Sequence, residues 1–381
     1  MRYSVDAHAI GQHLTGNETY IRNLLRGFAA LDHESEFIAY VSKECALADV
    51  PDRFTTRMVA TNPWRRLGFD LPRRVAADRP SLLHVQYTAP LACGVPVVVS
   101  VHDVSFLEYP EYFSRFRAIQ LRYTVRRTIL NAARVLTPSD FSKACIMRAY
   151  GLDDERITVM PNGVSSSFRP IARESASHWL QSKYSLPKRF ILSVGDLQPR
   201  KNHITLIRAF EQLLRAHPDF PQHLVLVGKH AWKSDEVVAA AKRSPVSERI
   251  HFMNFVADED LTRFYAACDV FVYPSLYEGF GLPIIEAMAC GRAVACSNTT
   301  AMPEVADSAA LLFDPRSEGE IVRAIRDLLI DSELRSRMER LGLQRSTLYS
   351  WDRTARRTLE VYYDVAGSTH RAAVRTSIPV R

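Results

Sequence analysis

Short apolar runs rich in β-branched residues alternate with segments of helical periodicity along most of this 381-residue chain. The clearest runs are "VPVVVSVHD", "FILSVGD", "HLVLVG" and "VFVYPS". Strands that are buried on both faces read as continuous apolar runs, and the helices between them provide the crossovers that parallel strands need. The pattern therefore predicts an α/β protein with doubly wound parallel sheets.

The alternation is interrupted at residues 165–187, where a polar stretch contains two prolines. A chain of this length can form two domains, each with its own core. The predicted parts are an N-terminal domain at 1–168 joined by a C-terminal helix at 351–367, a C-terminal domain at 187–350, and a disordered tail at 368–381.

The composition, with 47% hydrophobic and 24% charged residues, is ordinary for a globular protein. The N-terminal stretch "MRYSVDAHAIG" lacks the basic and apolar regions of a signal peptide. No apolar run approaches the roughly 20 residues of a membrane-spanning helix, so we expect no segment to cross a bilayer. The six cysteines include no C-x-x-C pair, and most lie in apolar segments, so we expect reduced core cysteines in a cytoplasmic protein.

The net charge of +7 favours anionic partners such as nucleotides, phospholipid surfaces or nucleic acid. No recognised nucleic-acid-binding motif accompanies the charge, so nucleic acid is not an expected partner.

The stretch "YEGFGLPIIEAMACGRAVA" at 277–295 indicates a strand end, a glycine-bearing turn and a helix start. Unpaired N–H groups and the helix dipole make such a start suitable for a phosphate, whereas a carboxylate accepts hydrogen bonds from ribose or sugar hydroxyls. The stretch therefore predicts a site for a nucleotide-sugar. The residues expected to contact this donor are Glu278, Gly279, Phe280, Gly281, Leu282, Pro283 and Glu286.

A second stretch, "SVGDLQPRKNHITLIRAF" at 193–210, also follows a strand and begins a helix. Arg200 and Lys201 lie side by side there, and two cations can stabilise the negative charge that grows on a departing diphosphate. Gly195 is the third residue of this stretch and is expected to lie at the same donor site.

The segment "EGFGLPIIE" resembles the E-x7-E signature of retaining GT-B glycosyltransferases of family 4, also called glycosyl transferases group 1. The resemblance extends over residues 3–365. It implies the GT-B fold, with two Rossmann-like doubly wound domains facing a central cleft. It also implies that the second domain binds the donor, that the first binds much of the acceptor, and that the sugar is transferred with retention and without a metal.

The resemblance assigns further residues. His102, in "VVVSVHDVSF", matches the histidine that faces the donor sugar across the cleft. Gly16 matches a loop glycine near the donor, although Glu18 stands where relatives often have a second glycine. Asp196 replaces an arginine common in the phosphate segment, so Arg200 and Lys201 are expected to bind the diphosphate. The residues that the resemblance implies for catalysis are His102, Arg200, Lys201 and Glu278.

The acidic triplet in "VADEDL" at 256–261 is similar to a metal-binding D-x-D motif, but it directly precedes a predicted helix. Acidic residues favour helix starts, so we interpret the triplet as a capping feature and expect no required metal.

The activity that the resemblance implies is transfer of a hexose, with a weak preference for mannose, from a GDP- or UDP-sugar to a glycan or lipid-linked glycan in surface polysaccharide synthesis. The nucleotide-sugar is a co-substrate, and no other cofactor is expected. Two alternatives stay open: a catalytically silent nucleotide-sugar-binding protein, and a sugar phosphorylase or epimerase of the same fold. A nicotinamide-dependent oxidoreductase is disfavoured, because "AIGQHLTGNE" does not fit G-x-G-x-x-G.

The segment "EYFSRFRAIQLRYTVRRTIL" at 111–130 interleaves aromatic residues with five arginines. Two interpretations are open: a solvated basic helix, or a face that rests on an anionic membrane surface. The second would place the protein peripherally at the inner face of the plasma membrane.

Overall fold

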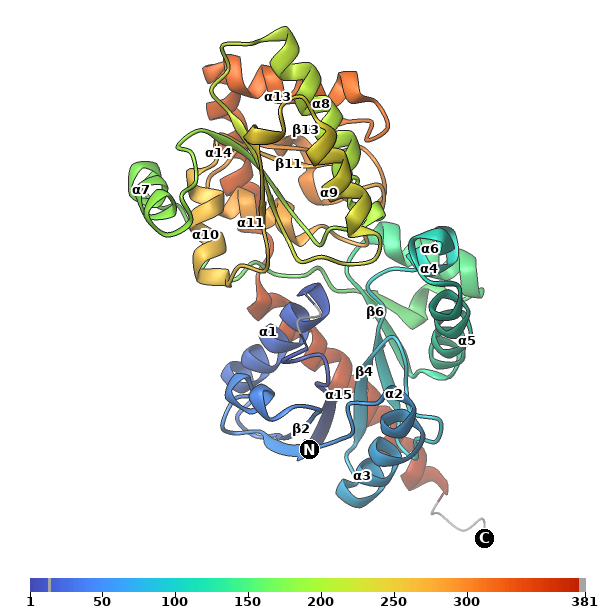
Figure 1. Ribbon diagram of the computed structural model, residues 1–381. Coiled ribbons are helices and arrows are strands. Elements are labelled where there is room, and N and C mark those ends of the chain that lie inside the picture. Colours follow the sequence, from blue (N-terminus) through green and yellow to red (C-terminus); the bar gives the residue numbers. More distant parts are fainter. Residues whose placement is uncertain (13–14, 377–381) are drawn as a thin grey trace. The chain divides into compact units, whose positions relative to one another are not determined.

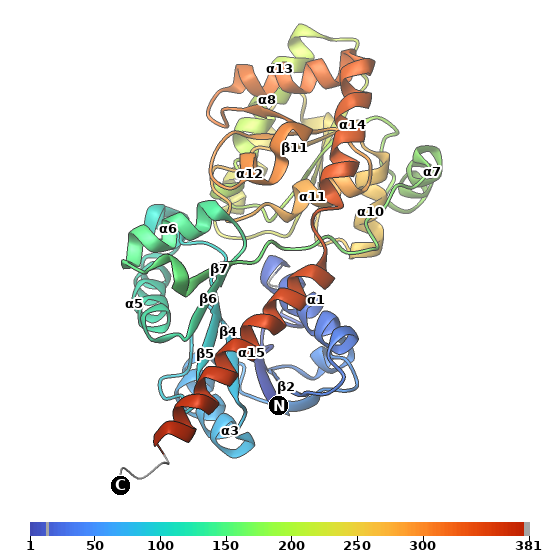
Figure 2. The same cartoon turned by 180° about the vertical axis from the view of Figure 1, so that it is seen from behind.

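The computed structural model describes residues 1–12 and 15–376, which divide into two compact units (Figures 1 and 2). The first unit comprises Met1–Glu108, Arg115–Gly163 and the C-terminal part from Ser350. The second comprises Tyr109–Ser114 and Val164–Tyr349. The segment 165–187 thus belongs to the second unit, because Phe168 and the residues around Leu180 pack in its core.

Within the described residues, the first unit contains a seven-stranded parallel sheet of order β3-β2-β1-β4-β5-β6-β7. The chain winds outward in both directions from the middle, so β1 and β4 meet where the strand order reverses. Ligands of open α/β sheets bind at the carboxyl ends of the strands at such a reversal. The strands are β1 Arg2–Asp6, β2 Glu36–Val41, β3 Thr55–Met58, β4 Leu82–Gln86, β5 Val97–Ser100, β6 Arg134–Thr137 and β7 Ile157–Val159.

Helices cover this sheet, and two of them, α1 and α15, pack against each other although they lie at opposite ends of the chain (Figure 2). The helices of the first unit are α1 Thr15–Leu31, α2 Pro63–Arg65, α3 Leu71–Asp78, α4 Ser105–Glu108, α5 Arg115–Asn131, α6 Asp140–Tyr150 and α15 Trp351–Thr376.

The C-terminal helix is longer than predicted. It begins at Trp351 as expected but continues to Thr376 instead of ending at residue 367. A glycine inside a helix costs only about 1 kcal/mol, and no proline follows Gly367 before residue 379, so nothing in the sequence stops the helix there. The last part of the predicted tail, 377–381, lies outside the described residues.

The second unit contains, among its described residues, a six-stranded parallel sheet of order β10-β9-β8-β11-β12-β13. Its strand order reverses between β8 and β11. The strands are β8 Phe190–Val194, β9 His223–Val227, β10 Ile250–Met253, β11 Val270–Tyr273, β12 Val294–Ser297 and β13 Ala310–Phe313.

Both faces of this second sheet are buried, as the continuous apolar runs predicted. Leu192 and Phe271 point into one apolar cluster, whereas their neighbours Ile191 and Val270 point into another. The helices that supply the rest of these clusters or flank them are α7 Arg173–Tyr184, α8 His203–Ala216, α9 Ser234–Arg243, α10 Asp258–Ala267, α11 Leu282–Ala289, α12 Met302–Ala306, α13 Glu318–Ile330 and α14 Ser332–Ser346. The doubly wound α/β class is confirmed in both units.

No helix among the described residues combines the length and the apolar character needed to cross a membrane.

Candidate functional site

The reversal of strand order in the second unit brings two predicted loops together. One loop follows β8 and contains Gly195, Arg200 and Lys201, and the other follows β11 and contains Glu278 and Gly281. Because β8 and β11 are hydrogen-bonded neighbours, their carboxyl ends lie side by side. Two hydrogen bonds join the loops: the Leu276 N–H donates to the Arg200 carbonyl at 2.8 Å, and the Arg200 side chain donates from Nη1 to the Tyr277 carbonyl at 2.6 Å.

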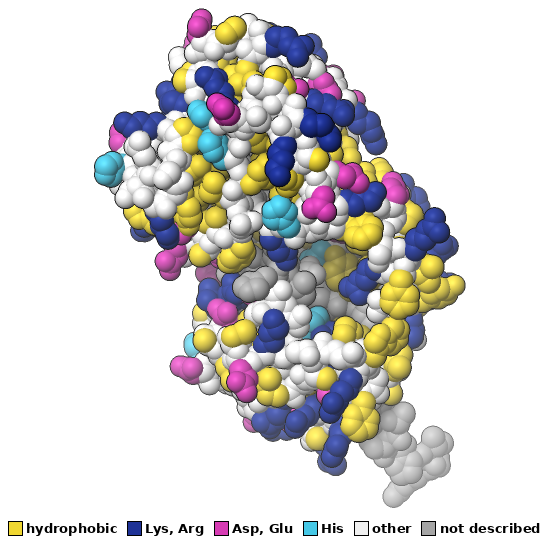
Figure 3. Space-filling model, viewed as in Figure 1, with side chains coloured by type: hydrophobic (Ala, Val, Ile, Leu, Met, Phe, Trp, Pro, Cys, Tyr) yellow, Lys and Arg dark blue, Asp and Glu magenta, His cyan; other side chains and the backbone are white. Residues whose placement is uncertain are grey.

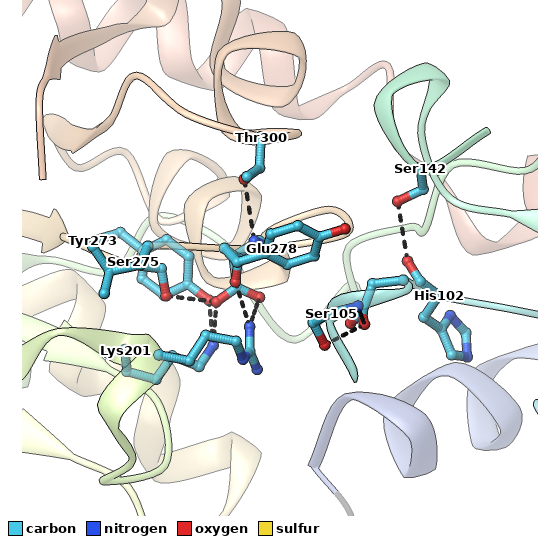
Figure 4. Close-up of polar contacts among 12 residues, drawn as sticks. His102, Ser105, Ser142, Lys201, Tyr273, Ser275, Glu278 and Thr300 are labelled. Carbon is cyan, nitrogen blue, oxygen red and sulfur yellow. Dashed lines mark hydrogen bonds and ion pairs between the residues drawn. The ribbon is translucent and has the colours of Figure 1, made fainter. Parts of the chain in front are cut away.

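The Glu278 carboxylate is the centre of this arrangement (Figure 4). Its Oε1 accepts from Lys201 Nζ at 2.7 Å and from Ser275 Oγ at 2.6 Å, and its Oε2 lies 2.8 Å from Arg200 Nη1. Its backbone N–H donates to Thr300 Oγ1 at 3.1 Å. All three charged side chains are largely buried, with exposed fractions of 10 to 15%. The cluster carries two positive charges and one negative charge in a fixed geometry.

The charges of this cluster set its ionisation. Burial on its own would raise the pKa of Glu278, but Arg200, Lys201 and the Ser275 hydroxyl stabilise the carboxylate and lower its pKa to about 2. Burial lowers the pKa of Lys201, and Glu278 opposes that shift. Lys201 also donates to the Tyr273 hydroxyl at 2.6 Å. We conclude that the cluster is an ion-pair network with a net charge of +1.

The start of α11 lies directly after this cluster in the sequence. Gly281 is its N-cap residue with φ of 107°, a conformation that favours glycine, and Pro283 occupies the first turn, as predicted. The neighbouring loop is also tight at Gly195, where a Cβ atom would lie 3.2 Å from the Lys201 side chain. The positive end of the α11 dipole and the two cations can together receive a diphosphate.

One of the predicted donor contacts, Phe280, has a side chain that points away from the turn. Phe280 is 5% exposed and packs edge-on against Tyr349 at 5.4 Å in the apolar core, so its backbone is the part that remains for a ligand. Leu282 and Pro283 are half-buried at the helix start. Gly279 lies in the turn between Glu278 and Phe280, as expected.

Glu286 has a different environment from Glu278. It lies on α11, is 9% exposed, and its Oε2 accepts from the Tyr265 hydroxyl of α10 at 2.8 Å. Burial raises its pKa to about 7, although the Tyr265 hydrogen bond opposes the shift. The sequence placed both carboxylates beside one turn, whereas the structure pairs Glu278 with two cations and gives Glu286 a phenol as its partner and a raised pKa.

The residue at the arginine position of relatives, Asp196, lies beside a lysine. Its Oδ2 is 3.9 Å from Lys229 Nζ, and burial raises its pKa while Lys229 and Lys201 oppose that shift. Arg200 and Lys201 both pair with Glu278 in one cluster. The geometry therefore does not single out either cation as the main contact for a diphosphate.

The acidic triplet lies in the first turn of α10, where the positive end of the helix dipole stabilises acidic side chains. The N-cap residue itself is Ala257 and has no side-chain capping bond, so the predicted capping role is corrected to first-turn acids. Asp260 binds Lys183 and Tyr184, each at 2.7 Å. Among the described residues, no group of three or more His, Cys, Asp and Glu side chains is arranged to hold a metal ion.

The first unit contains the other two predicted site residues. His102 lies just beyond β5, is half-buried, and its Nε2 is 2.9 Å from Oε1 of Gln86 (its backbone carbonyl accepts from Ser142, Figure 4). Burial lowers its pKa to about 4, so the ring is neutral at pH 7. Gly16 lies in the first turn of α1, where a Cβ would meet open space. The neighbouring Glu18 accepts from the Gly11 N–H at 3.0 Å.

Sequence reasoning missed several partners of the predicted residues. Two of these partners could have been predicted from the sequence, namely Gln86 at the end of "SLLHVQ" and Tyr273 at the end of "VFVY". Each is a polar residue at the carboxyl end of a buried strand, and that end of a parallel sheet is where ligands bind. Tyr265 could not have been predicted as a site residue, because its position in α10 fits an ordinary amphipathic helix.

Comparison with known proteins finds a family model for each half of the chain. The family model described as glycosyl transferases group 1 matches residues 181–345, and that of glycosyltransferase family 4 matches residues 14–168. O-antigen chain mannosyltransferase B of Escherichia coli is 35% identical over 266 residues, which cover 70% of this chain and 69% of that protein. The serotype-specific mannosyltransferase WbdA of Escherichia coli is 37% identical over 48% of this chain, but the match spans only 22% of WbdA.

Among solved structures, Anabaena HepE in complex with UDP-glucose matches with a TM-score of 0.75 and 18% identity. The match covers 95% of this chain and 99% of HepE, and at this identity it shows a shared fold. Two doubly wound units, together with matches to two glycosyltransferase family models, define a GT-B glycosyltransferase. This chain belongs to family 4 of the glycosyltransferases, the glycosyl transferases group 1.

Proposed function

We propose that this protein transfers a hexose, preferably mannose, from a nucleotide-sugar to a glycan or lipid-linked glycan acceptor during synthesis of a surface polysaccharide. The observation that carries the proposal is the Glu278–Arg200–Lys201 network beside the start of α11. The preference for mannose is supported by the names of the Escherichia coli relatives, both of which are mannosyltransferases.

In this proposal the donor diphosphate lies at the net positive charge of the network and at the positive end of the α11 dipole. Glu278 holds both cations in place before the donor arrives, so little reorganisation accompanies the growth of charge on the leaving diphosphate. Glu286 receives ribose hydroxyls. The cations and the helix start would supply the stabilisation that a metal supplies in other transferases.

We further propose transfer with retention along a front-face path. The bond from the anomeric carbon to the phosphate oxygen breaks, the acceptor hydroxyl oxygen bonds to the same face, and its proton passes to the leaving phosphate. NMR of the product should show the anomeric configuration of the donor. A trapped covalent sugar adduct on the protein would contradict this path.

The direct test is thermal stabilisation by GDP, UDP, GDP-mannose and UDP-glucose, each with EDTA. A ligand that binds only the folded state raises Tm, by an amount equivalent to about 2.7 kcal/mol at a hundredfold excess over Kd. We expect one nucleotide to stabilise the protein in EDTA, and Lys201→Met and Glu286→Ala to lose that stabilisation.

The matched control is Arg208→Met, which removes an exposed cation paired with Glu318 on α8 and α13. It should retain the full shift. No shift with any nucleotide would contradict the donor site, and a shift that requires added metal would contradict metal independence. A shift without any sugar transfer would favour the silent binding protein. Phosphate-dependent release of a sugar 1-phosphate would favour the phosphorylase.

We also propose that α5 of the first unit rests on an anionic membrane surface at the inner face of the plasma membrane. Phe116, Ile119 and Tyr123 are 70%, 58% and 71% exposed, and their spacing places them on one side of the helix. Hydrophobic and basic side chains lie next to one another on the surface over α5 (Figure 3). This combination fits the interfacial region of a bilayer that contains anionic lipid.

The structure corrects one detail of this surface. Arg127 donates to the backbone carbonyls of Ala89, Pro90 and Leu91, so it has a structural role. Four exposed arginines remain for lipid headgroups, namely Arg115, Arg117, Arg122 and Arg126. At low salt, the protein should sediment with phosphatidylglycerol vesicles and not with phosphatidylcholine vesicles. Unchanged sedimentation after replacement of all four arginines by glutamine would contradict the proposal.

A further inference from the structure

The side chain of Gln86 in the first unit contacts the imidazole of His102. The two residues lie at the carboxyl ends of the neighbouring strands β4 and β5, where Gln86 is paired in register with Ser100. The Gln86 side chain is 5% exposed, and its Oε1 lies 2.9 Å from His102 Nε2. An amide oxygen only accepts hydrogen bonds, so this contact requires the proton of the neutral imidazole to be on Nε2.

Two aromatic rings hold the same imidazole. Tyr20 lies edge-on to His102 with ring centroids 4.7 Å apart, and Tyr87 lies at 5.7 Å. Tyr87, the residue directly after Gln86, has a left-handed backbone with φ of 60°. A bulky residue adopts this conformation rarely, and such strain persists where the surrounding structure requires a particular geometry.

A buried polar chain behind the imidazole fixes Tyr20. The Tyr20 hydroxyl is 2.8 Å from Ser100 Oγ, which is also 2.8 Å from His84 Nε2. His84 Nδ1 is 2.6 Å from the Tyr362 hydroxyl of α15. Tyr20 therefore cannot rotate away from His102 without breaking a contact in this chain.

The other end of the Gln86 amide shows that the residue is not optimal for stability. Its Nε2 is buried without a hydrogen-bond partner among the described residues. A buried unpaired donor destabilises the folded state, and an apolar side chain of similar shape would avoid that penalty. Gln86 is therefore better explained by what its oxygen does to His102.

We propose that Gln86 is a positioning residue that keeps His102 in the Nε2–H tautomer and leaves Nδ1 as an acceptor for a sugar hydroxyl. The tautomer follows from the geometry of the first unit alone. Only the identity of the hydroxyl rests on the proposed function, in which a sugar donor and a glycan acceptor are both substrates.

The test is ¹⁵N NMR of the full-length protein with labelled histidine, with His102 assigned by the resonances that disappear in His102→Ala. We expect the wild-type protein to show a protonated Nε2 and an unprotonated Nδ1. Gln86→Glu keeps an acceptor at the same place and should retain this tautomer. Gln86→Leu removes the acceptor and should give a mixture of tautomers. A proton on Nδ1 in the wild type, or an unchanged tautomer in Gln86→Leu, would overturn the proposal.

Two further measurements separate positioning from a structural role. The urea midpoint of Gln86→Leu should stay close to that of the wild type, because removal of the unpaired donor offsets loss of the hydrogen bond to His102. Its kcat for sugar transfer should fall about 10-fold with little change in KM, as expected for loss of one hydrogen bond that orients the imidazole, and Gln86→Glu should recover most of the loss. If Gln86→Leu fails to fold, Gln86→Met provides the same test with an unbranched side chain. Absence of transferase activity would contradict the proposed function but leave the NMR result decisive for the tautomer.

Discussion

Two glutamates of one motif have opposite ionisation behaviour. Glu278 is surrounded by Arg200 and Lys201, which lower its pKa to about 2, whereas Glu286 has a phenol as partner and burial raises its pKa to about 7. Both are buried to a similar extent, with 8% and 9% exposed. The difference therefore comes from neighbouring charge and not from burial.

Replacement of Glu278 by glutamine should strongly destabilise the protein. It would leave two largely buried cations without their anion, a change that costs about 3 to 5 kcal/mol in comparable buried pairs. Urea unfolding at pH 7 measures the loss. The matched control is Glu36→Gln, whose pair with Arg2 is exposed and should contribute less than about 1 kcal/mol. An equal small loss in both variants would show that the buried network does not stabilise the fold.

The raised pKa of Glu286 predicts that the stability of the protein depends on pH. Its pKa is about 7 in the folded protein and 4.5 in the unfolded chain, so the folded state binds more protons between these values. Stability attributable to Glu286 is therefore fully present below about pH 4.5 and is lost as the pH rises towards 7.

Glu286→Gln cannot lose that proton, so its stability relative to the wild type should rise by about 2 to 3 kcal/mol between pH 4.5 and 8. Urea unfolding of both proteins at several pH values measures the difference. A constant difference across the range would contradict the raised pKa of Glu286.

At the scale of elements, the packing of α1 on α15 depends on one small residue. A Cβ atom at Gly27 of α1 would lie 2.4 Å from the Ala355 Cβ atom of α15, well inside contact distance. Gly27→Ala should therefore destabilise the first unit by about 1 to 3 kcal/mol, despite the better helix propensity of alanine. Denaturant unfolding and amide exchange of α15 measure the effect.

The control for this prediction is Gly367→Ala in α15, where a Cβ meets nothing within 4 Å. The effect on stability should then depend on helix propensity alone, and the free energy of unfolding should rise by up to about 1 kcal/mol. A gain in Gly27→Ala as well would show that the two helices separate readily.

At the scale of the molecule, each unit has its own sheet and its own apolar core. Multi-domain proteins often deviate from two-state unfolding, and a ligand stabilises the part that binds it. A bound nucleotide should therefore slow amide exchange in β8, β11 and the start of α11, with little change in β2 and β3. Equal protection of both sheets would contradict donor binding by the second unit alone.

The predictability of the site differs from residue to residue. Arg200, Lys201 and Glu278 were recognised in their loops, because helix starts, glycines and charges form local patterns. Their mutual ion pairs were not, because Lys201 and Glu278 are 77 residues apart and meet only through the adjacency of β8 and β11. The contact of Gln86 with His102 could not be predicted for the same reason, because it depends on the adjacency of β4 and β5.

By itself, the sequence determined the parallel α/β class and the two-part organisation, and it predicted residues for a nucleotide-sugar, because periodicity, turn chemistry and charge are local properties. Only the tertiary structure decided the strand order, the pairing of Glu278 with two cations, the neutralising environment of Glu286 and the contact of Gln86 with His102. These depend on which distant strands become neighbours, and burial beside a particular partner, not residue type, then sets the charge of each group.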